Sequence, residues 1–178
     1  MTIISIHAPT EEQDENDKEE FYSTLEGVCN TLPQYDHWMI MGDFNAKIGK
    51  EDYQKQVAGT HTLHDASNDN GKMLGHFAAR NKMLIKSTWF PHKNIHKGTW
   101  KIPGTGETNQ IDHVLSSARH ASSVIDVRSY RGPNCDSDHY LVKAVVRERL
   151  AKIQNLKATK KKLWNTDRFK ETPVRDDY

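Results

Sequence analysis

The first part of the chain alternates apolar segments with charged ones in an order that predicts a β-α-β unit. Residues 2–7 contain three isoleucines and stop before Pro9, which predicts a short strand. An acidic stretch at 11–17 favours the start of a helix, and apolar residues at helical spacing continue it up to Pro33. These apolar residues are Phe21, Leu25, Val28 and Leu32. With a second strand at 38–42, the pattern indicates a layered α/β design.

The middle of the chain predicts a loop, one more helix and a series of short strands. From Lys47 to Asn70 the residues are polar and interrupted by glycines, which indicates a long surface loop. A second helix is predicted over 71–81. Its inward residues would be Met73, Leu74, Phe77 and Ala78. Strands are predicted at about 84–90, 98–101, 109–116, 123–128 and 139–147. Their close spacing favours largely antiparallel sheets.

The character of the chain changes after Val146. Between Arg147 and Lys170 there are nine basic residues and two acidic ones, so this stretch carries a net charge of +7. Apolar residues are sparse there, and we expect an exposed basic helix that leads into a disordered tail. We therefore predict a folded domain at 1–148 and a basic linker at 149–178.

Composition limits the classes of protein to consider. The 178 residues suffice for one domain, and hydrophobic residues make up 35%. The formal net charge is +1, so any attraction to nucleic acid must be local. No apolar stretch approaches the ~20 residues that span a bilayer, and the N-terminus does not have the form of a secretion signal. Two cysteines, Cys29 and Cys135, form no disulfide framework, which indicates a reducing, intracellular compartment.

Three polar clusters next to predicted strands carry the candidate chemistry. They are Gly42-Asp43-Phe44-Asn45, Gln110-Ile111-Asp112-His113 and Ser137-Asp138-His139. Taken singly, the first is also typical of a tight turn and the last of a surface or capping histidine. Together, carboxylates, an amide and a histidine at strand ends suit the hydrolysis of a phosphodiester with a metal ion. A buried Asp112 beside His139 would fix the tautomer of the imidazole.

The order of the motifs resembles a known superfamily. Gly-Asp-Phe-Asn-Ala at 42–46, Asn-Asp-Asn-Gly at 68–71, Thr99-Trp100, the cluster at 109–112 and Ser-Asp-His at 137–139 occur in this order in endonuclease/exonuclease/phosphatase proteins. Over residues 1–148 the chain is most similar to the apurinic-type endonuclease domain of non-LTR (LINE-like) retrotransposons and to the craniofacial development protein 2-like sequences derived from them. The basic tail resembles the linker that leads toward the reverse transcriptase of such elements.

The resemblance implies a fold and a set of roles. The fold would be a four-layered α/β sandwich of two mostly antiparallel sheets flanked by helices, with magnesium, or manganese in its place, at one edge. Asp43 would activate or orient the attacking water, and Asn45 would hold the scissile phosphate. His139 would neutralise charge on the phosphoryl oxygens, with Asp112 orienting it. Asp138 would help to bind the metal or position water. These roles suit phosphoryl transfer, which depends on positioning and charge neutralisation.

The chain also departs from the family pattern. The family begins with a strand that bears an asparagine, followed by the main metal-binding glutamate, and both precede the segment that matches residues 3–6. We therefore expect an N-terminally truncated domain that lacks its first strands, with unpaired sheet edges. The acidic stretch at 11–17 is in the wrong place to replace the glutamate. His7 stands where relatives carry a tyrosine that touches the phosphate. Histidine could donate a hydrogen bond in its place, with a different reach and charge, and the alternative is simple drift in a relic copy.

Three functions remain open on these grounds. The first is a metal-dependent DNA endonuclease, whose activity the truncation puts in question. The second is a phosphatase of the same fold. The third is a non-catalytic domesticated nucleic-acid-binding or scaffold protein, held in the nucleus by Lys160, Lys161 and Lys162. We expect DNA as the partner, and neither a membrane nor a disulfide-linked protein. Oligomeric state and DNA preference stay open.

Overall fold

The β-α-β unit predicted from the sequence opens the structure. In this computed structural model, strand β1 (Thr2–His7) leads through helix α1 (Glu15–Thr31) to strand β2 (Trp38–Asp43), and the two strands pair in parallel. The structure describes residues 1–33, 35–132 and 136–148, and Met1–Glu148 form one compact unit. The basic segment predicted at 149–178, with Lys160, Lys161 and Lys162, lies outside the described residues, as does Cys135.

A four-stranded sheet forms the centre of this unit, in the order β1-β2-β6-β3. Strand β6 (Asp112–Ser117) runs antiparallel to both β2 and β3 (Met83–Ile85). A two-stranded sheet pairs β7 (Val124–Tyr130) with β8 (Leu141–Val146), and a short hairpin pairs β4 (Trp100–Lys101) with β5 (Thr108–Asn109). Among the strands of the described residues, all pairings except β1 with β2 are antiparallel, as the short, closely spaced strands predict, and one isolated bridge, between Ala58 and Ile85, is parallel.

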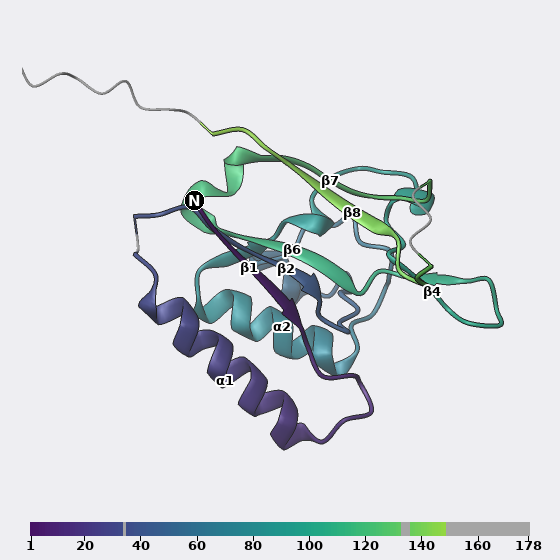
Figure 1. Cartoon of the computed structure of the whole chain (residues 1–178), viewed down its shortest axis with the longest axis horizontal. Helices are drawn as coiled ribbons and strands as arrows, with labels where there is room; N and C mark the ends of the chain where they lie inside the picture. The colour runs from purple at the N-terminus through teal and green to yellow at the C-terminus, as the bar shows by residue number, and fades with distance from the viewer. Residues whose placement is uncertain (34, 133–135, 149–178) are drawn as a thin grey trace, which may run out of the picture. The chain divides into compact units, whose positions relative to one another are not determined.

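The elements pack in layers around two apolar cores (Figure 1). Helices α1 and α2 (Asp69–Arg80) cover one face of the central sheet, where Leu25, Ile40 and Leu115 belong to the larger core. The β7–β8 sheet covers the other face, around Met39 and Val127. Alternation along β2 decides this arrangement, because successive side chains point to opposite faces. The chain is thus an α/β sandwich, which confirms the predicted fold class.

Helix α1 exposes a residue that the sequence assigns to its inward face. Val28 is 42% exposed, whereas Tyr22, Leu25 and Cys29 are buried. Lys18 continues the same stripe, because its aliphatic stem is buried while its Nζ donates to the carbonyl of Glu11 at 2.6 Å. The inward face therefore does not follow the apolar spacing alone, since a lysine stem and a cysteine contribute to it.

The segment from Lys47 to Asn70 is not a surface loop throughout, which corrects the sequence expectation. Apart from a short 3₁₀ helix, η1 (Asp52–Gln56), it lacks regular structure up to α2, but several of its side chains are buried. These are Ile48, Gln54, Val57, Ala58 and Thr62. Gln54 donates from Nε2 to the carbonyl of Gly71 at 3.1 Å. Polar side chains that pair with backbone groups let an irregular segment be buried. The polarity of the sequence therefore does not show that this segment lies at the surface.

Two further differences concern strand extent and strand edges. The strand predicted at 84–90 is confined to β3, after which the chain turns into a 3₁₀ helix, η2 (Lys86–Thr88). Two more 3₁₀ helices are η3 (Asn94–His96) and η4 (Ala118–Ser123). In the described ranges β1 pairs with β2 alone and β8 with β7 alone, so each keeps one unpaired edge. None of the described helices is both long and apolar enough to cross a membrane.

Candidate functional site

Three polar residues lie in one row across neighbouring strands. His7 is the register partner of Asp43 on β2, and Asp43 is the register partner of Asp112 on β6. Directly paired residues place their side chains on the same face of a sheet. Met39, Met41 and Asp43 alternate along β2, so this row lies on the face that carries the β7–β8 core. Residues distant in the sequence thus converge at one end of the central sheet.

His139 and Asp112 form the pair that the sequence suggests. Nδ1 of His139 lies 3.1 Å from Oδ2 of Asp112, and the histidine backbone N–H donates to the hydroxyl of Ser137 at 3.1 Å. Burial raises the pKa of the Asp112 carboxyl, and the nearby charge of Asp43 adds to the rise, while the Thr99 hydroxyl and His139 oppose it. The Thr99 hydroxyl also accepts the N–H of Ile111 at 3.0 Å and of Asp112 at 3.1 Å. Asp112 is therefore fixed through both its backbone and its carboxylate.

Asp43 occupies the centre of the row. Its Oδ1 accepts the backbone N–H of Asn45 at 2.8 Å. Its Oδ2 faces two imidazoles, 3.7 Å from Nε2 of His7 and 3.9 Å from Nε2 of His139. The carboxylate is mostly buried, with 16% of its side chain exposed, whereas 77% of the His7 side chain is exposed. Asp43 and His139 thus face a common space, with His7 at its solvent side.

The backbone just before Asp43 requires glycine. Gly42 has φ +146°, and a Cβ there would lie 2.0 Å from the carbonyl oxygen of Ile6. Only glycine tolerates this combination of dihedral angle and close approach. The Gly-Asp sequence is therefore what lets β1 and β2 approach closely enough to align His7 with Asp43.

Asn45 adopts a left-handed conformation, with φ +49°. Its Nδ2 donates to the carbonyl of Ala8 at 2.9 Å, which ties the turn after β2 to the end of β1. Its own carbonyl accepts the amide groups of Asn68 and Asn70, each at 3.2 Å. One of its two amide hydrogens is therefore engaged within the chain, and its role on a phosphate stays a prediction.

Asp138 lies at the exposed side of the site. Nε1 of Trp100 donates to its Oδ2 at 2.7 Å, and this hydrogen bond is the main cause that lowers the pKa of the carboxyl. Trp100 also forms a β-bridge with His139, and the centres of the two rings are 6.4 Å apart. The β4–β5 hairpin thus supports the Ser-Asp-His segment from one side.

His64 and His113 form buried hydrogen bonds near the row, and the sequence did not predict these contacts. His113 is 1% exposed; its Nδ1 lies 2.7 Å from the Ser87 hydroxyl and its Nε2 lies 2.8 Å from the carbonyl of Ala46. His64 accepts the backbone N–H of Gln110 through Nε2 at 3.1 Å. Burial lowers the pKa of both His64 and His113 to about 4. Both imidazoles are therefore neutral near pH 7. His64 connects the segment after β2 with Gln110 before β6, and His113 connects β6 with Ala46 and Ser87.

Glu11 has a structural role outside the row. Its carboxylate accepts the backbone N–H groups of Asp69 at 2.9 Å and Asn70 at 3.2 Å, and the side-chain amide of Asn68 at 2.7 Å. These groups lie at the N-terminus of α2, where unpaired donors and the helix dipole favour a carboxylate. Glu11, in the acidic stretch at 11–17, thus caps helix α2. The sequence gave no sign of this contact, because the two segments are far apart in the chain.

The predicted metal ion would be held by carboxylates of this site. Within residues 1–33, 35–132 and 136–148, no group of three His, Cys, Asp or Glu side chains is arranged to hold a metal ion. One oxygen of each candidate carboxylate is already hydrogen-bonded: Asp43 to Asn45, Asp112 to His139 and Asp138 to Trp100. Each of these carboxylates has a second oxygen, and magnesium in proteins is commonly held by one or two carboxylates together with waters and substrate phosphates. Magnesium and manganese therefore stay predictions, and no chemical step is derived through them.

Comparison with known proteins decides the family. Residues 1–143 match the profile of the family described as endonuclease-reverse transcriptase. The chain belongs to this family. Its members fall within the endonuclease/exonuclease/phosphatase superfamily that the motif order indicates. Craniofacial development protein 2 of Bos taurus is 31% identical over 150 residues, which are 84% of this chain and 25% of that protein. The chain thus spans about a quarter of the length of this relative.

Solved structures agree on the fold of this endonuclease-reverse transcriptase family member. The 3′ phosphatase NExo from Neisseria, bound to product DNA hairpin, matches with a TM-score of 0.59 at 20% identity, over 82% of this chain and 61% of that one. The endonuclease domain of TRAS1, a telomere-specific non-LTR retrotransposon, matches with a TM-score of 0.52 at 13% identity, over 74% of this chain and 52% of that one. Both comparisons support the α/β sandwich.

Proposed function

We propose that this chain is a phosphodiester hydrolase of the endonuclease type that acts on DNA. The observation that carries the proposal is the shared space between Asp43 and His139, where Oδ2 of Asp43 lies 3.9 Å from Nε2 of His139 while Asp112 holds the opposite ring nitrogen at 3.1 Å. A carboxylate that accepts a proton and an oriented imidazole are the groups that hydrolysis of a phosphate ester requires.

Three residues then take separate roles in the attack of water on the phosphodiester. Oδ2 of Asp43 accepts a proton from the attacking water, whose oxygen forms the new bond to phosphorus as the bond to the leaving sugar oxygen breaks. His139, held by Asp112 through Nδ1, turns Nε2 toward the phosphate and neutralises charge on the phosphoryl oxygens. His7, at the solvent side of Asp43, donates a hydrogen bond to the same phosphate, in the place where relatives carry a tyrosine.

Two alternative functions make different predictions. A non-catalytic nucleic-acid-binding protein is favoured by the lack of a three-ligand metal group in the described residues, and it would bind DNA without cutting it. A phosphatase is favoured by the structural likeness to a protein described as a 3′ phosphatase. It would release inorganic phosphate from a 3′-phosphorylated oligonucleotide and leave a closed circular plasmid intact.

Nicking of supercoiled plasmid tests the proposal directly. The chain is compared with Asp43→Ala and His139→Ala, in magnesium, in manganese and in EDTA, with His76→Ala as a control on the exposed side of α2. The expected result is nicking that both site variants lose and that His76→Ala retains. Nicking that persists in both site variants, or none from the unaltered chain, would contradict it. The EDTA arm decides whether a divalent metal is needed.

A further inference from the structure

The outward face of the β7–β8 sheet carries a combination of side chains that the proposed function leaves unused. Val127 and Ser129 on β7 are buried and the inward residues of β8 (Val142, Ala144 and Val146) are partly buried, so the alternate residues point away from the central sheet. Arg128 and Lys143 are register partners on this outward face, and Tyr130 is paired with Leu141. Cross-strand neighbours therefore place basic and aromatic groups side by side.

Cations and aromatic rings contact one another along this face. The Arg128 guanidinium lies 5.5 Å from the centre of the Tyr130 ring, and the Lys143 ammonium lies 5.7 Å from it. Past the ends of the two strands, the Arg131 guanidinium lies 5.0 Å from the centre of the Tyr140 ring, and its Nε donates to the carbonyl of Ile95 at 3.2 Å. These distances are within the range of cation–π contacts. We call Arg128, Tyr130, Arg131, Tyr140 and Lys143 the β7–β8 strip.

The strip is continuous with the candidate site. Tyr140 directly follows His139, and its backbone N–H donates to the carbonyl of Thr99 at 2.7 Å, the residue whose hydroxyl holds Asp112. Asp126, which precedes the strip on β7, is paired with His92 at 2.5 Å and with Arg128 at 2.9 Å. Arg131 and Lys143 are both exposed. A chain of phosphates that reaches His139 would therefore meet exposed cations on the adjoining strands.

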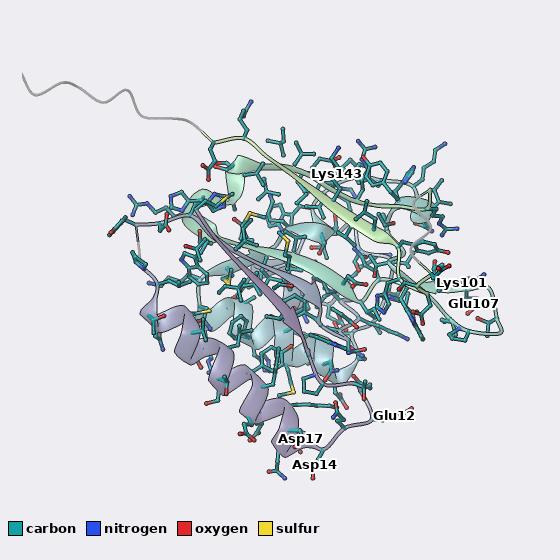
Figure 2. The ribbon with its side chains drawn as sticks, in the orientation of Figure 1. Glu12, Asp14, Asp17, Lys101, Glu107 and Lys143 are labelled. Carbon is teal, nitrogen blue, oxygen red and sulfur yellow. The ribbon has the colours of Figure 1, made fainter. Side chains whose placement is uncertain are left out.

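Charge is distributed unequally over the unit. Figure 2 shows Glu12, Asp14 and Asp17 around the start of α1, on the helix side, and Lys143 on the opposite side, at β8. Acidic side chains at the start of α1 repel a polyanion, whereas the Lys143 ammonium attracts one. An overall charge of +1 conceals this asymmetry.

We propose that the β7–β8 strip binds a single-stranded segment of nucleic acid next to the scissile phosphate. Aromatic rings interleaved with basic side chains are the means by which proteins hold single strands, because rings stack on bases while cations follow the backbone. The inference rests on the proposed function for its nucleic-acid substrate. It extends that function by assigning the surface that holds the strand beyond the site.

Binding without cleavage tests the strip. A fluorescein-labelled single-stranded oligonucleotide and a duplex of equal length are titrated with the full chain in EDTA, at several salt concentrations, by fluorescence anisotropy. The test variants are Arg131→Glu with Lys143→Glu, and Tyr130→Leu, which keeps an apolar side chain but removes the ring. The matched control is Lys55→Glu with Arg119→Glu, which makes the same change in net charge at exposed positions elsewhere in the fold. Thermal unfolding confirms that each variant is folded.

The double strip variant should weaken binding of the single strand and lower the slope of log affinity against log salt by about 0.7 for each lost cation. Tyr130→Leu should weaken single-strand binding by about tenfold, with a smaller effect on the duplex. Affinities and slopes equal to those of the control would overturn the proposal, and so would equal losses for single strand and duplex. Strip-dependent binding by a chain that nicks no plasmid would refute the proposed hydrolase and leave the strip in place.

Discussion

Nδ1 of His139 lies 3.1 Å from Oδ2 of Asp112, although the two residues are 27 positions apart in the chain. Asp112 lies at the start of β6, and His139 lies in the segment that leads into β8. The contact therefore connects the central sheet with the β7–β8 sheet. A carboxylate on one ring nitrogen leaves the other free to act on a substrate, so the tautomer of His139 follows from packing between sheets.

This pair should behave as one unit in kinetics. Asp112→Asn preserves the shape of the side chain but removes its charge, so Nδ1 of His139 loses its carboxylate partner. We expect plasmid nicking to fall by about 10²–10⁴-fold in Asp112→Asn and in His139→Ala. The double variant should be little worse than either single one, because residues that act together are not additive. Losses that multiply would show that the two residues act independently. The measurement is the initial rate of nicking at saturating DNA.

Gly42 should be intolerant of any side chain. In Gly42→Ala the new Cβ would meet the carbonyl oxygen of Ile6, at a φ of +146° that alanine disfavours. We expect a loss of several kcal/mol in the free energy of unfolding by urea. The control is Gly27→Ala in helix α1, where a Cβ meets nothing within 4 Å. That substitution should stabilise the chain by about 0.5–1 kcal/mol. Equal effects at the two glycines would contradict the close approach of β1 and β2.

Stability should fall as the pH drops below neutrality. The pKa values of His64 and His113 are about 4 in the folded chain, against 6.5 for an ordinary histidine. Between pH 6.5 and pH 4 these two histidines bind protons in the unfolded chain but not in the folded chain. Their contribution to stability is therefore full above pH 6.5 and falls as the pH decreases toward 4. Each histidine should remove about 3 kcal/mol over that window. Urea unfolding at pH 7, 6 and 5 measures the decline.

The raised pKa of Asp112 acts in the opposite direction, since the folded chain protonates that carboxyl more readily than the unfolded chain does. His113→Asn separates the two effects, because asparagine retains a donor and an acceptor but does not titrate. Its unfolding free energy should depend less on pH than that of the unaltered chain. If the unfolding free energy of His113→Asn depended on pH as strongly as that of the unaltered chain, His113 would not be responsible for the decline.

Glu11 should stabilise α2 from outside the helix. Glu11→Ala removes the acceptor for the N–H groups of Asp69 and Asn70, so we expect a loss of about 1 kcal/mol in the free energy of unfolding. The neighbouring Glu12 makes no comparable contact among the described residues and is exposed, so Glu12→Ala should change stability by less than about 0.5 kcal/mol. Similar values for the two variants would argue against the cap. Chemical denaturation at pH 7 is the measurement.

Local sequence patterns account for the elements but not for their exact faces or lengths. The helix at 69–80 follows from its apolar spacing and from the Asn68 cap, which accepts the backbone N–H of Gly71. In α1 the apolar spacing includes Val28, which is exposed, and omits Cys29, which is buried. The difference arises because spacing alone does not reveal that the stem of Lys18 belongs to the inward stripe. The strand predicted at 84–90 ends early because residues 86–88 turn into a 3₁₀ helix.

The sequence by itself determined the β-α-β opening, the largely antiparallel sheets, the family and the residue types at the candidate site, because these depend on periodicity and on short motifs. Only the tertiary structure decided which residues meet. Pairing between β1, β2 and β6 aligned His7, Asp43 and Asp112, and packing between two sheets brought His139 to Asp112. The hydrogen-bond partners of His64, His113 and Glu11 also could not be predicted from the sequence, because contacts between distant segments leave no local pattern in the chain.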